Sequence, residues 1–219
     1  MLKIAETFTS VQGEGDWIGV PMFFVRLAGC NVGKKDIASD PSLPWETCTT
    51  IEGNHFTCDT NFRKQEEWSV DDLVKAFKES GLDHICITGG EPFLQAEVID
   101  LIKHFGRVGE GTCHVETSGT LPIPEGLPCW ITCSPKQGFL KSNIKEVEEF
   151  KFLVGRDTDI PKLEEVIESL DIERSAIFLS PINFVADLDT SSLNACLQLL
   201  VKHPSWRLGV QLHKVYNLR

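Results

Sequence analysis

Short apolar runs alternate along most of the chain with segments whose apolar residues recur at helical spacing. The first clear strand is expected at 21–27. Further strands are expected at 83–88, 112–117, 130–133, 150–154, 176–179 and 207–212, and helices at 70–80, 94–105, 143–149, 160–170 and 190–202. Strands that alternate with helices indicate parallel βα units, so we expect an α/β fold of about six strands, open or wound into part of a barrel.

Residues 7–15 are polar, contain two glycines and predict a loop after a short strand. Gln12 and Glu14 offer an amide and a carboxylate beside glycines that allow close approach of a ligand, although a plain turn is the alternative. In the strand that follows, Arg26 is a cation within an apolar run. It needs an anionic partner, either a carboxylate of the protein or one on a ligand.

Polar motifs follow several predicted strands at the point where each strand ends. They are Gly89-Gly90-Glu91-Pro92, Glu116-Thr117-Ser118-Gly119-Thr120, Ser134-Pro135-Lys136, Ser180-Pro181-Ile182-Asn183 and Gln211-Leu212-His213. The carboxyl ends of parallel strands converge on one rim, where ligands bind. The sequence therefore predicts one site, built from these loops and the cysteine-containing stretch 29–60.

The eight cysteines fall into two groups. Five lie in or beside predicted strands and helices and are expected to be small buried residues: Cys86, Cys113, Cys129, Cys133 and Cys196. Cys30, Cys48 and Cys58 lie in a long polar stretch and are candidate metal ligands. A structural zinc site takes four protein ligands, whereas a cluster held by three thiolates leaves one metal position open for chemistry.

Composition narrows the class of protein. A chain of 219 residues, 42% apolar and 24% charged, fits one globular domain, placed at 1–219. The net charge of −11 argues against nucleic acid or an anionic membrane as a partner. No apolar leader follows Met1, and no run approaches the roughly 20 residues of a membrane helix, so we expect a cytoplasmic protein with reduced cysteines.

Together these residues resemble the radical S-adenosylmethionine (SAM) superfamily and, within it, the 7-carboxy-7-deazaguanine synthase family of queuosine (7-deazapurine) biosynthesis. The similarity covers nearly the whole chain. Its segments are 11–15 (Val-Gln-Gly-Glu-Gly), 26–30 (Arg-Leu-Ala-Gly-Cys), 58–60 (Cys-Asp-Thr), 88–92 (Thr-Gly-Gly-Glu-Pro), 116–120, 134–136 and 211–214. One feature departs from the superfamily, whose cysteines usually follow the compact pattern Cys-x3-Cys-x2-Cys. Here they spread over 29 residues, an expanded loop at 30–60, with Thr57 before Cys58.

The resemblance implies a partial TIM-type barrel with helices outside, and a 4Fe–4S cluster bound by Cys30, Cys48 and Cys58. It also implies ring contraction of 6-carboxy-5,6,7,8-tetrahydropterin to 7-carboxy-7-deazaguanine with loss of ammonia. The SAM-binding residues it implies are Thr57, Cys58, Asp59, Gly90, Glu91, Thr117, Ser134, Pro135, Lys136, Ser180, Pro181, Ile182 and Asn183. The substrate-binding residues it implies are Val11, Gln12, Gly13, Glu14, Arg26, Thr88, His213 and the terminal Arg219, with Thr60 as a ligand of Mg²⁺.

The resemblance further implies a homodimer and an electron donor such as flavodoxin or ferredoxin. Two other functions are weighed against this one. An activase that places a glycyl radical on a partner protein would need a mouth open to a polypeptide. A non-catalytic iron–sulfur or zinc-binding regulator would need four protein ligands, and it leaves the Gly-Gly-Glu-Pro loop unexplained.

Overall fold

A curved mixed sheet forms the body of the protein. The structure, a computed structural model, describes residues 1–33, 46–58, 60–108, 111–183 and 189–218. Among these residues the sheet has nine strands in the order β11-β10-β9-β8-β7-β6-β2-β1-β5. Their bounds are β1 (Leu2–Val11), β2 (Pro21–Leu27), β5 (Glu66–Trp68), β6 (His84–Gly89), β7 (Thr112–Thr117), β8 (Trp130–Cys133), β9 (Glu149–Val154), β10 (Ala176–Pro181) and β11 (Arg207–Leu208). Strands β2, β6, β7, β8, β9, β10 and β11 are parallel to one another, whereas β1 pairs antiparallel with both β2 and β5.

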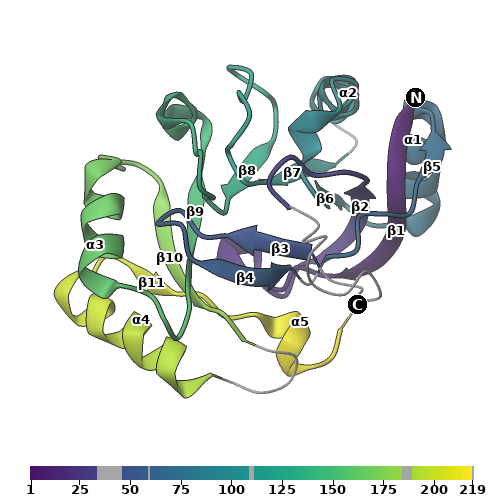
Figure 1. The fold of residues 1–219 in the computed structure, drawn as a ribbon. Helices are drawn as coiled ribbons and strands as arrows, with labels where there is room; N and C mark the ends of the chain where they lie inside the picture. Colours follow the sequence, from purple (N-terminus) through teal and green to yellow (C-terminus); the bar gives the residue numbers. More distant parts are fainter. Residues whose placement is uncertain (34–45, 59, 109–110, 184–188, 219) are drawn as a thin grey trace.

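The helices pack against the outer side of this sheet, as Figure 1 shows for α2, α3 and α4. The helices are α1 (Val70–Ser80), α2 (Val98–Val108), α3 (Ile160–Ser169), α4 (Thr190–Lys202) and α5 (Leu212–Val215), with short 3₁₀ segments η1 (Gly15–Trp17), η2 (Pro92–Leu94) and η3 (Lys141–Glu146). Ser69 and Asp72 form a capping box at the start of α1, and Asp159 caps α3. This is the expected α/β partial barrel. No helix among the described residues is long and apolar enough to cross a membrane.

The two sides of the sheet differ in polarity because side chains alternate along each strand. Ile87, Val115 and Phe150 face outward into two apolar clusters that α1 and α2, and then α3 and α4, complete. The alternate positions in the same strands carry polar residues: Glu116 is half-buried, and Thr88, Thr132, Glu149, Lys151 and Ser180 are buried. The interior of the partial barrel therefore holds many polar residues beside a small apolar cluster of Met22, Phe24 and Cys86. Its polar part suits a binding site better than a core.

A separate two-stranded hairpin, β3 (Glu46–Thr49) and β4 (His55–Cys58), lies in front of the sheet in Figure 1. Its turn is held against α3, because the Lys162 ammonium donates to the Glu52 carbonyl at 2.8 Å. Past its other end, the Gly29 amide donates to the Phe62 carbonyl at 3.1 Å. The expanded cysteine loop therefore includes an ordered hairpin tied to both β2 and α3.

Four predicted segments differ from the structure. Residues 7–11, predicted as a loop, belong to β1, where Phe8 stacks on Phe24 of β2 with ring centroids 5.0 Å apart. The helix predicted at 94–105 is η2 followed by α2 from Val98. The helix predicted at 143–149 is the 3₁₀ segment η3, because the Asn143 amide bonds the carbonyls of Gly119 and Leu121 and β9 already begins at Glu149. The strand predicted at 207–212 ends at Leu208.

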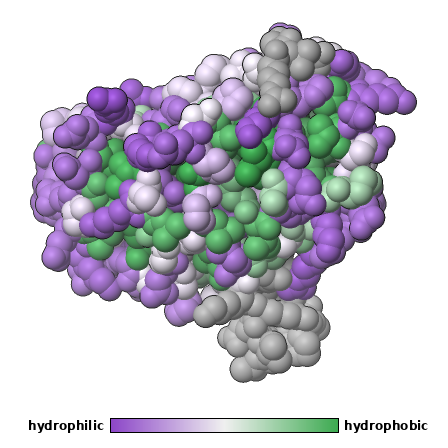
Figure 2. Space-filling view, turned by 90° about the horizontal axis from the view of Figure 1, so that it is seen from above, coloured by the Kyte–Doolittle hydropathy of each residue, from purple (hydrophilic) through white to green (hydrophobic). Residues whose placement is uncertain are grey.

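The face seen from above in Figure 2 has hydrophilic residues along most of its margin. Hydrophobic residues are visible between them toward the middle of the face. Apolar side chains thus reach this surface in places, as they do in most folded proteins.

Candidate active site

The loop after β2 brings Cys30 against the Gly89-Gly90-Glu91-Pro92 turn. A Cβ atom added to Gly90 would lie 2.0 Å from the Gly29 carbonyl oxygen and 2.7 Å from the Cys30 Cβ, so only glycine fits there. The Cys30 Sγ lies 3.4 Å from the backbone nitrogens of both Val32 and Gly33, which donate to it. Two N–H groups aimed at one sulfur suit a thiolate that binds a metal cluster.

Cys48 and Cys58 share one face of the β3–β4 hairpin. Cys48 pairs with Phe56 across the ladder, and Cys58 lies two residues further along the same strand. Because side chains alternate in a strand, both sulfurs project from the same side, as diagonal neighbours. Thr57 projects from the opposite side and is exposed. Cys48 is buried, and Cys58 lies within reach of the Thr60 carbonyl, with Sγ 3.9 Å from its oxygen.

Lys136 links the hairpin to the loop after β8. Its ammonium lies 5.8 Å from the centre of the Phe56 ring and donates to the Ser134 carbonyl at 2.8 Å and hydroxyl at 2.6 Å. Burial lowers the pKa of Lys136, whereas Cys48 and, more weakly, Cys58 act in the opposite direction. The predicted Ser134-Pro135-Lys136 motif thus lies beside both hairpin cysteines and supplies them with a positive charge.

Glu91 joins the loop after β6 to the loop after β7. Its side chain is fully buried and accepts from the Thr117 hydroxyl at 2.8 Å, the Ser118 amide at 2.9 Å and the Ser118 hydroxyl. Two residues predicted to contact SAM, Glu91 and Thr117, therefore contact each other. Both Glu91 oxygens accept hydrogen bonds from the protein, so this carboxylate holds the loops after β6 and β7 together at the rim.

The segment from Ser180 to Asn183 ends β10 and lies at the same rim. Ser180 is buried, and the Ile182 amide donates to the Val154 carbonyl at 2.8 Å. The Asn183 side chain accepts from the Asp189 amide at 3.0 Å, and its carbonyl accepts from the Lys214 ammonium at 3.1 Å. Pro181, also buried, completes the segment. These contacts connect the end of β10 to the start of α4 and to α5.

The loop after β1 lies against the last helix, as predicted for residues of one site. The Gly13 carbonyl accepts from the Leu212 amide at 2.9 Å, and a Cβ on Gly13 would lie 2.6 Å from the His213 Nδ1. The Gln12 side-chain oxygen accepts from the Gly13 amide at 2.8 Å. Val11, at the end of β1, is half-buried beside them.

A buried charged cluster lies beneath this loop. The Lys151 ammonium contacts a Glu14 carboxylate oxygen and lies 3.5 Å from a Glu116 oxygen. Burial opposes ionisation of both acids, but Lys151 overcomes it: the pKa of Glu14 falls to about 2 and that of Glu116 below its ordinary value. Gln211 donates to the other Glu14 oxygen at 2.9 Å.

The remaining predicted substrate residues lie on the neighbouring strands. The Thr88 hydroxyl donates to Glu116 at 2.9 Å. Arg26 forms an ion pair with Glu6 at 2.9 Å, which supplies the anionic partner that its position required, and it keeps 19% of its side chain exposed. Thr60 is half-buried after the hairpin. Asp59 and Arg219 lie outside the described residues.

Sequence reasoning missed Lys151 and its neighbour Glu149. Both are charged residues in the apolar run Glu-Phe-Lys-Phe-Leu, and their alternation with phenylalanines could have identified an inward polar face, as it did for Arg26. Glu149 is buried, bonds the Thr132 hydroxyl at 2.6 Å, and has a pKa raised by burial.

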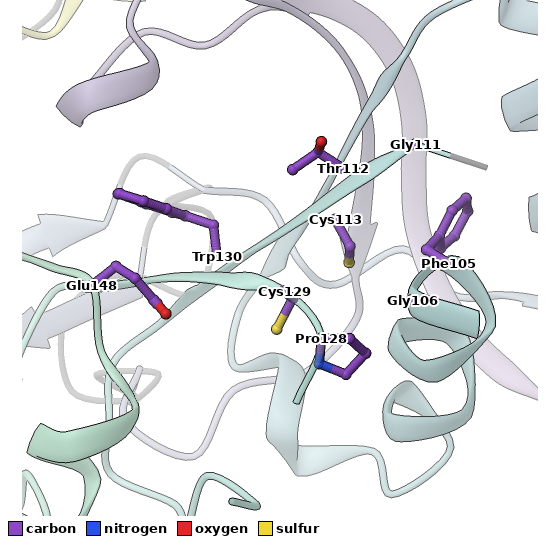
Figure 3. A pocket seen from close by; sticks show the side chains of 9 residues that line it. All are labelled: Phe105, Gly106, Gly111, Thr112, Cys113, Pro128, Cys129, Trp130 and Glu148. Carbon is purple, nitrogen blue, oxygen red and sulfur yellow. The ribbon is translucent and has the colours of Figure 1, made fainter. Parts of the chain in front are cut away.

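A cavity of about 430 Å³ lies elsewhere, at the amino ends of β7 and β8. Figure 3 shows that Cys113, Cys129 and Glu148 line it together with Phe105 and Trp130. Burial raises the pKa of both thiols, that of Cys129 to about 12, so neither is a ready nucleophile or metal ligand. Four of the five cysteines expected to be core residues are buried, and Cys129 is half-buried.

An open parallel α/β barrel with three cysteines and a Gly-Gly-Glu-Pro turn at its rim defines a radical SAM enzyme. No family model matches the sequence. The chain is, however, 32% identical to 7-carboxy-7-deazaguanine synthase of Escherichia coli K12 over 98% of both chains, and 31% identical to that of Bacteroides thetaiotaomicron over the full length of both. The crystal structure of QueE from Escherichia coli superposes with a TM-score of 0.72 at 28% identity, covering 97% of this chain and 94% of that one. The chain belongs to the 7-carboxy-7-deazaguanine synthase family.

Proposed function

We propose that this protein is a carbon–nitrogen lyase that contracts the ring of 6-carboxy-5,6,7,8-tetrahydropterin to 7-carboxy-7-deazaguanine with loss of ammonia. Full-length similarity to synthases of this activity is the observation that carries the proposal. It is supported by the polar interior of the barrel, which offers carboxylates and an amide to a heterocycle rich in N–H groups. Neither the activase nor the regulator accounts for this buried set of acceptors.

The residues present fit the two cofactors of the family, a 4Fe–4S cluster and SAM. Cys30, Cys48 and Cys58 would hold the cluster, and the N–H groups donated to the Cys30 sulfur suit a thiolate ligand. The residues proposed to hold SAM are Thr57, Cys58, Asp59, Gly90, Glu91, Thr117, Ser134, Pro135, Lys136, Ser180, Pro181, Ile182 and Asn183. When bound, these groups supply a reducing electron and a 5′-deoxyadenosyl radical that abstracts hydrogen from the substrate.

The protein's own task is to bind and orient. Gly90 allows the turn to approach Cys30, and Glu91 fixes that turn to the loop after β7. Lys136 places a positive charge beside the hairpin thiolates, which stabilises their ionised form. The β3–β4 hairpin lies in front of the sheet (Figure 1), with Phe56 beside Lys136, and we assign to it the exclusion of water from the reacting groups.

We assign substrate binding to Val11, Gln12, Gly13, Glu14, Arg26, Thr88, His213 and Arg219. One unsatisfied group supports this assignment. The Gln211 side-chain oxygen is buried and has no hydrogen-bond partner among the described residues, although its amide nitrogen bonds Glu14. A buried acceptor without a donor is costly, and an N–H of the pterin would satisfy it.

Thr60 is the proposed protein ligand of Mg²⁺, which would also bind the substrate carboxylate. Magnesium takes few protein ligands and several outside oxygens, so one hydroxyl beside the site suffices. Thr60→Ala should weaken the dependence of the rate on Mg²⁺. An unchanged magnesium titration would reject this role.

Four further properties belong to the proposal. The reaction needs an external electron, for which a flavodoxin or ferredoxin is the donor class. The enzyme works as a homodimer in the cytoplasm, where its thiols stay reduced. Residues 1–219 act as one radical SAM domain.

An anaerobic assay tests the function directly. Iron–sulfur-reconstituted protein would be incubated with SAM, Mg²⁺, a reductant and 6-carboxytetrahydropterin, and mass spectrometry would follow 5′-deoxyadenosine and the deazapurine together. Formation of both is expected. Deoxyadenosine without product would overturn the substrate, and neither compound from iron-loaded protein would overturn the radical SAM activity.

A further inference from the structure

One lysine inside the barrel joins two acids that come from distant parts of the chain. Lys151 projects from β9 and keeps only 8% of its side chain exposed. Glu14 reaches it from the loop after β1, with 14% of its side chain exposed, and Glu116 from β7, with 25%. This ammonium therefore stands between two carboxylates that would otherwise face each other inside the protein.

Hydrogen bonds fix the positions of both acids. Glu116 accepts from Thr88 at 2.9 Å and from Gln12 at 3.3 Å, in addition to its contact with Lys151. Glu14 accepts from Gln211 at 2.9 Å. The partners of these acids, Gln12 and Thr88, come from segments predicted to bind the substrate. Among the described residues, the ion pairs of the Lys151 ammonium are with these two acids, and Lys136 of the proposed SAM set is close enough to act on it electrostatically.

Lys151, Glu14 and Glu116 bring three ionisable groups together where little of each side chain meets water. Two carboxylates that are mostly removed from water, as Glu14 and Glu116 are, cannot both ionise cheaply without a counter-charge, and one of them would retain a proton. Lys151 supplies that charge: burial alone would lower its pKa, but Glu116 and Glu14 raise it above the ordinary value. A protonated carboxyl accepts fewer hydrogen bonds than a carboxylate.

From this arrangement we infer that Lys151 is a positioning residue of the substrate site, which holds Glu14 and Glu116 as paired, ionised acceptors for N–H groups of the pterin. The inference rests on the proposed function and deepens it. A pterin presents an amino group and ring N–H groups, and each needs an acceptor when water is excluded. Two carboxylates and the free Gln211 oxygen provide such acceptors on adjacent elements.

Other charged groups face Lys151, Glu14 and Glu116 and are the same in all variants of Lys151. They are Glu149 and Lys136, which interact with Lys151, His213, which interacts with Glu14, and Arg26, which interacts with Cys86, as Glu116 also does. Of these, Glu149 is the one that raises the pKa of Lys151 further. Replacing Lys151 alone therefore changes the charge that both acids share while leaving the surroundings as they are.

The test compares Lys151→Met, Lys151→Arg and a surface control, Lys75→Met, whose side chain is 77% exposed on α1. Binding of the unreactive product 7-carboxy-7-deazaguanine would be measured by calorimetry from pH 6 to 9, alongside KM, kcat and SAM cleavage. We expect Lys151→Met to weaken binding and raise KM at least tenfold at pH 7. The loss should shrink as pH rises, because the acids then ionise without the lysine. Lys151→Arg should recover much of the affinity, and SAM cleavage should persist in all variants.

The role of Lys151 and the proposed function are contradicted by different results. Lys151→Met binding with wild-type affinity, or with a loss that is the same at every pH, would overturn the role of Lys151 while leaving the function intact. Wild-type protein that binds and converts no pterin would instead overturn the proposed function. If Lys151→Met does not fold, Lys151→Met combined with Glu14→Gln removes one of the facing charges. Its Glu116 should ionise again, so its affinity should no longer improve with pH; continued improvement would contradict the inference.

Discussion

Gly13 and His213, separated by nearly the whole chain, touch at the substrate side of the site. The space between them is too small for a methyl group, since a Cβ on Gly13 would lie 2.6 Å from the His213 Nδ1. Neither residue can shift freely, because the Leu212 amide also donates to the Gly13 carbonyl at 2.9 Å. The glycine of the first loop thereby sets the position of the last histidine.

Gly13→Ala should displace His213 and raise KM for the pterin about tenfold or more, with SAM cleavage retained. Overpacking of this kind typically costs about 1–3 kcal/mol of stability as well. Gly155→Ala is the matched control, because its Cβ would lie 3.4 Å from the Ile182 Cδ1 and 3.8 Å from the Thr158 Oγ1, both ordinary contacts. Steady-state kinetics of both variants check the prediction, and equal KM values would contradict it.

Cys48→Ala should abolish iron binding and SAM cleavage, because Cys48 shares a hairpin face with Cys58. Iron content after reconstitution and deoxyadenosine formation are the measurements. Cys196→Ala serves as the control: this buried residue of α4 should cost about 1–3 kcal/mol of stability and no chemistry. Normal cleavage by the Cys48 variant would mean that another group is the second ligand.

His114 should make the protein less stable in mild acid. The His84 Nδ1 lies 3.1 Å from the His114 Nε2. Burial lowers the pKa of His114 to about 4, and the neighbouring His84 contributes to the shift as the smaller cause. The unfolded chain binds a proton near pH 6.5, whereas the folded one does not until about pH 4. Stability is therefore complete above pH 6.5 and falls as pH drops toward 4, by roughly 2 kcal/mol between pH 7.5 and 5.

His114→Gln should remove most of this dependence. Urea unfolding of iron-free protein at pH 7.5 and pH 5 measures it, with His55→Gln on the exposed edge of the hairpin as the control. The same loss of stability in wild type and in the His114 variant would refute the assignment.

Lys162→Met should loosen the hairpin, because it removes the hydrogen bond to the Glu52 carbonyl. Hydrogen exchange of backbone amides at 46–58 should become faster, with little change in α1. Lys141→Met removes a similar bond, from its ammonium to the Ser169 carbonyl at 3.0 Å at the other end of α3, and should leave the hairpin unaffected. If exchange is the same in both variants, the anchor does not hold the hairpin.

The sequence predicted the parallel βα units and the rim on which the motifs meet, because apolar runs and strand-end motifs are local signals. It placed Gly90, Glu91 and Lys136 at one rim, where the structure also has them. It did not predict the strand at 7–11, because Thr7, Thr9 and Ser10 make this segment look polar. The segment is a strand because it pairs with β2, where Phe8 stacks on Phe24. Nor could it place Lys151 between Glu14 and Glu116, since that contact depends on how three distant segments close around the interior.

The β3–β4 hairpin carries two of the three cysteines proposed to bind the cluster. Cys30 follows β2, whereas Cys48 and Cys58 belong to a hairpin whose turn rests on α3. A cluster bound to all three would act as a cross-link that closes the chain from 30 to 58. Loss of the cluster would remove this cross-link, so the protein with its cluster would unfold less readily than the same chain without it.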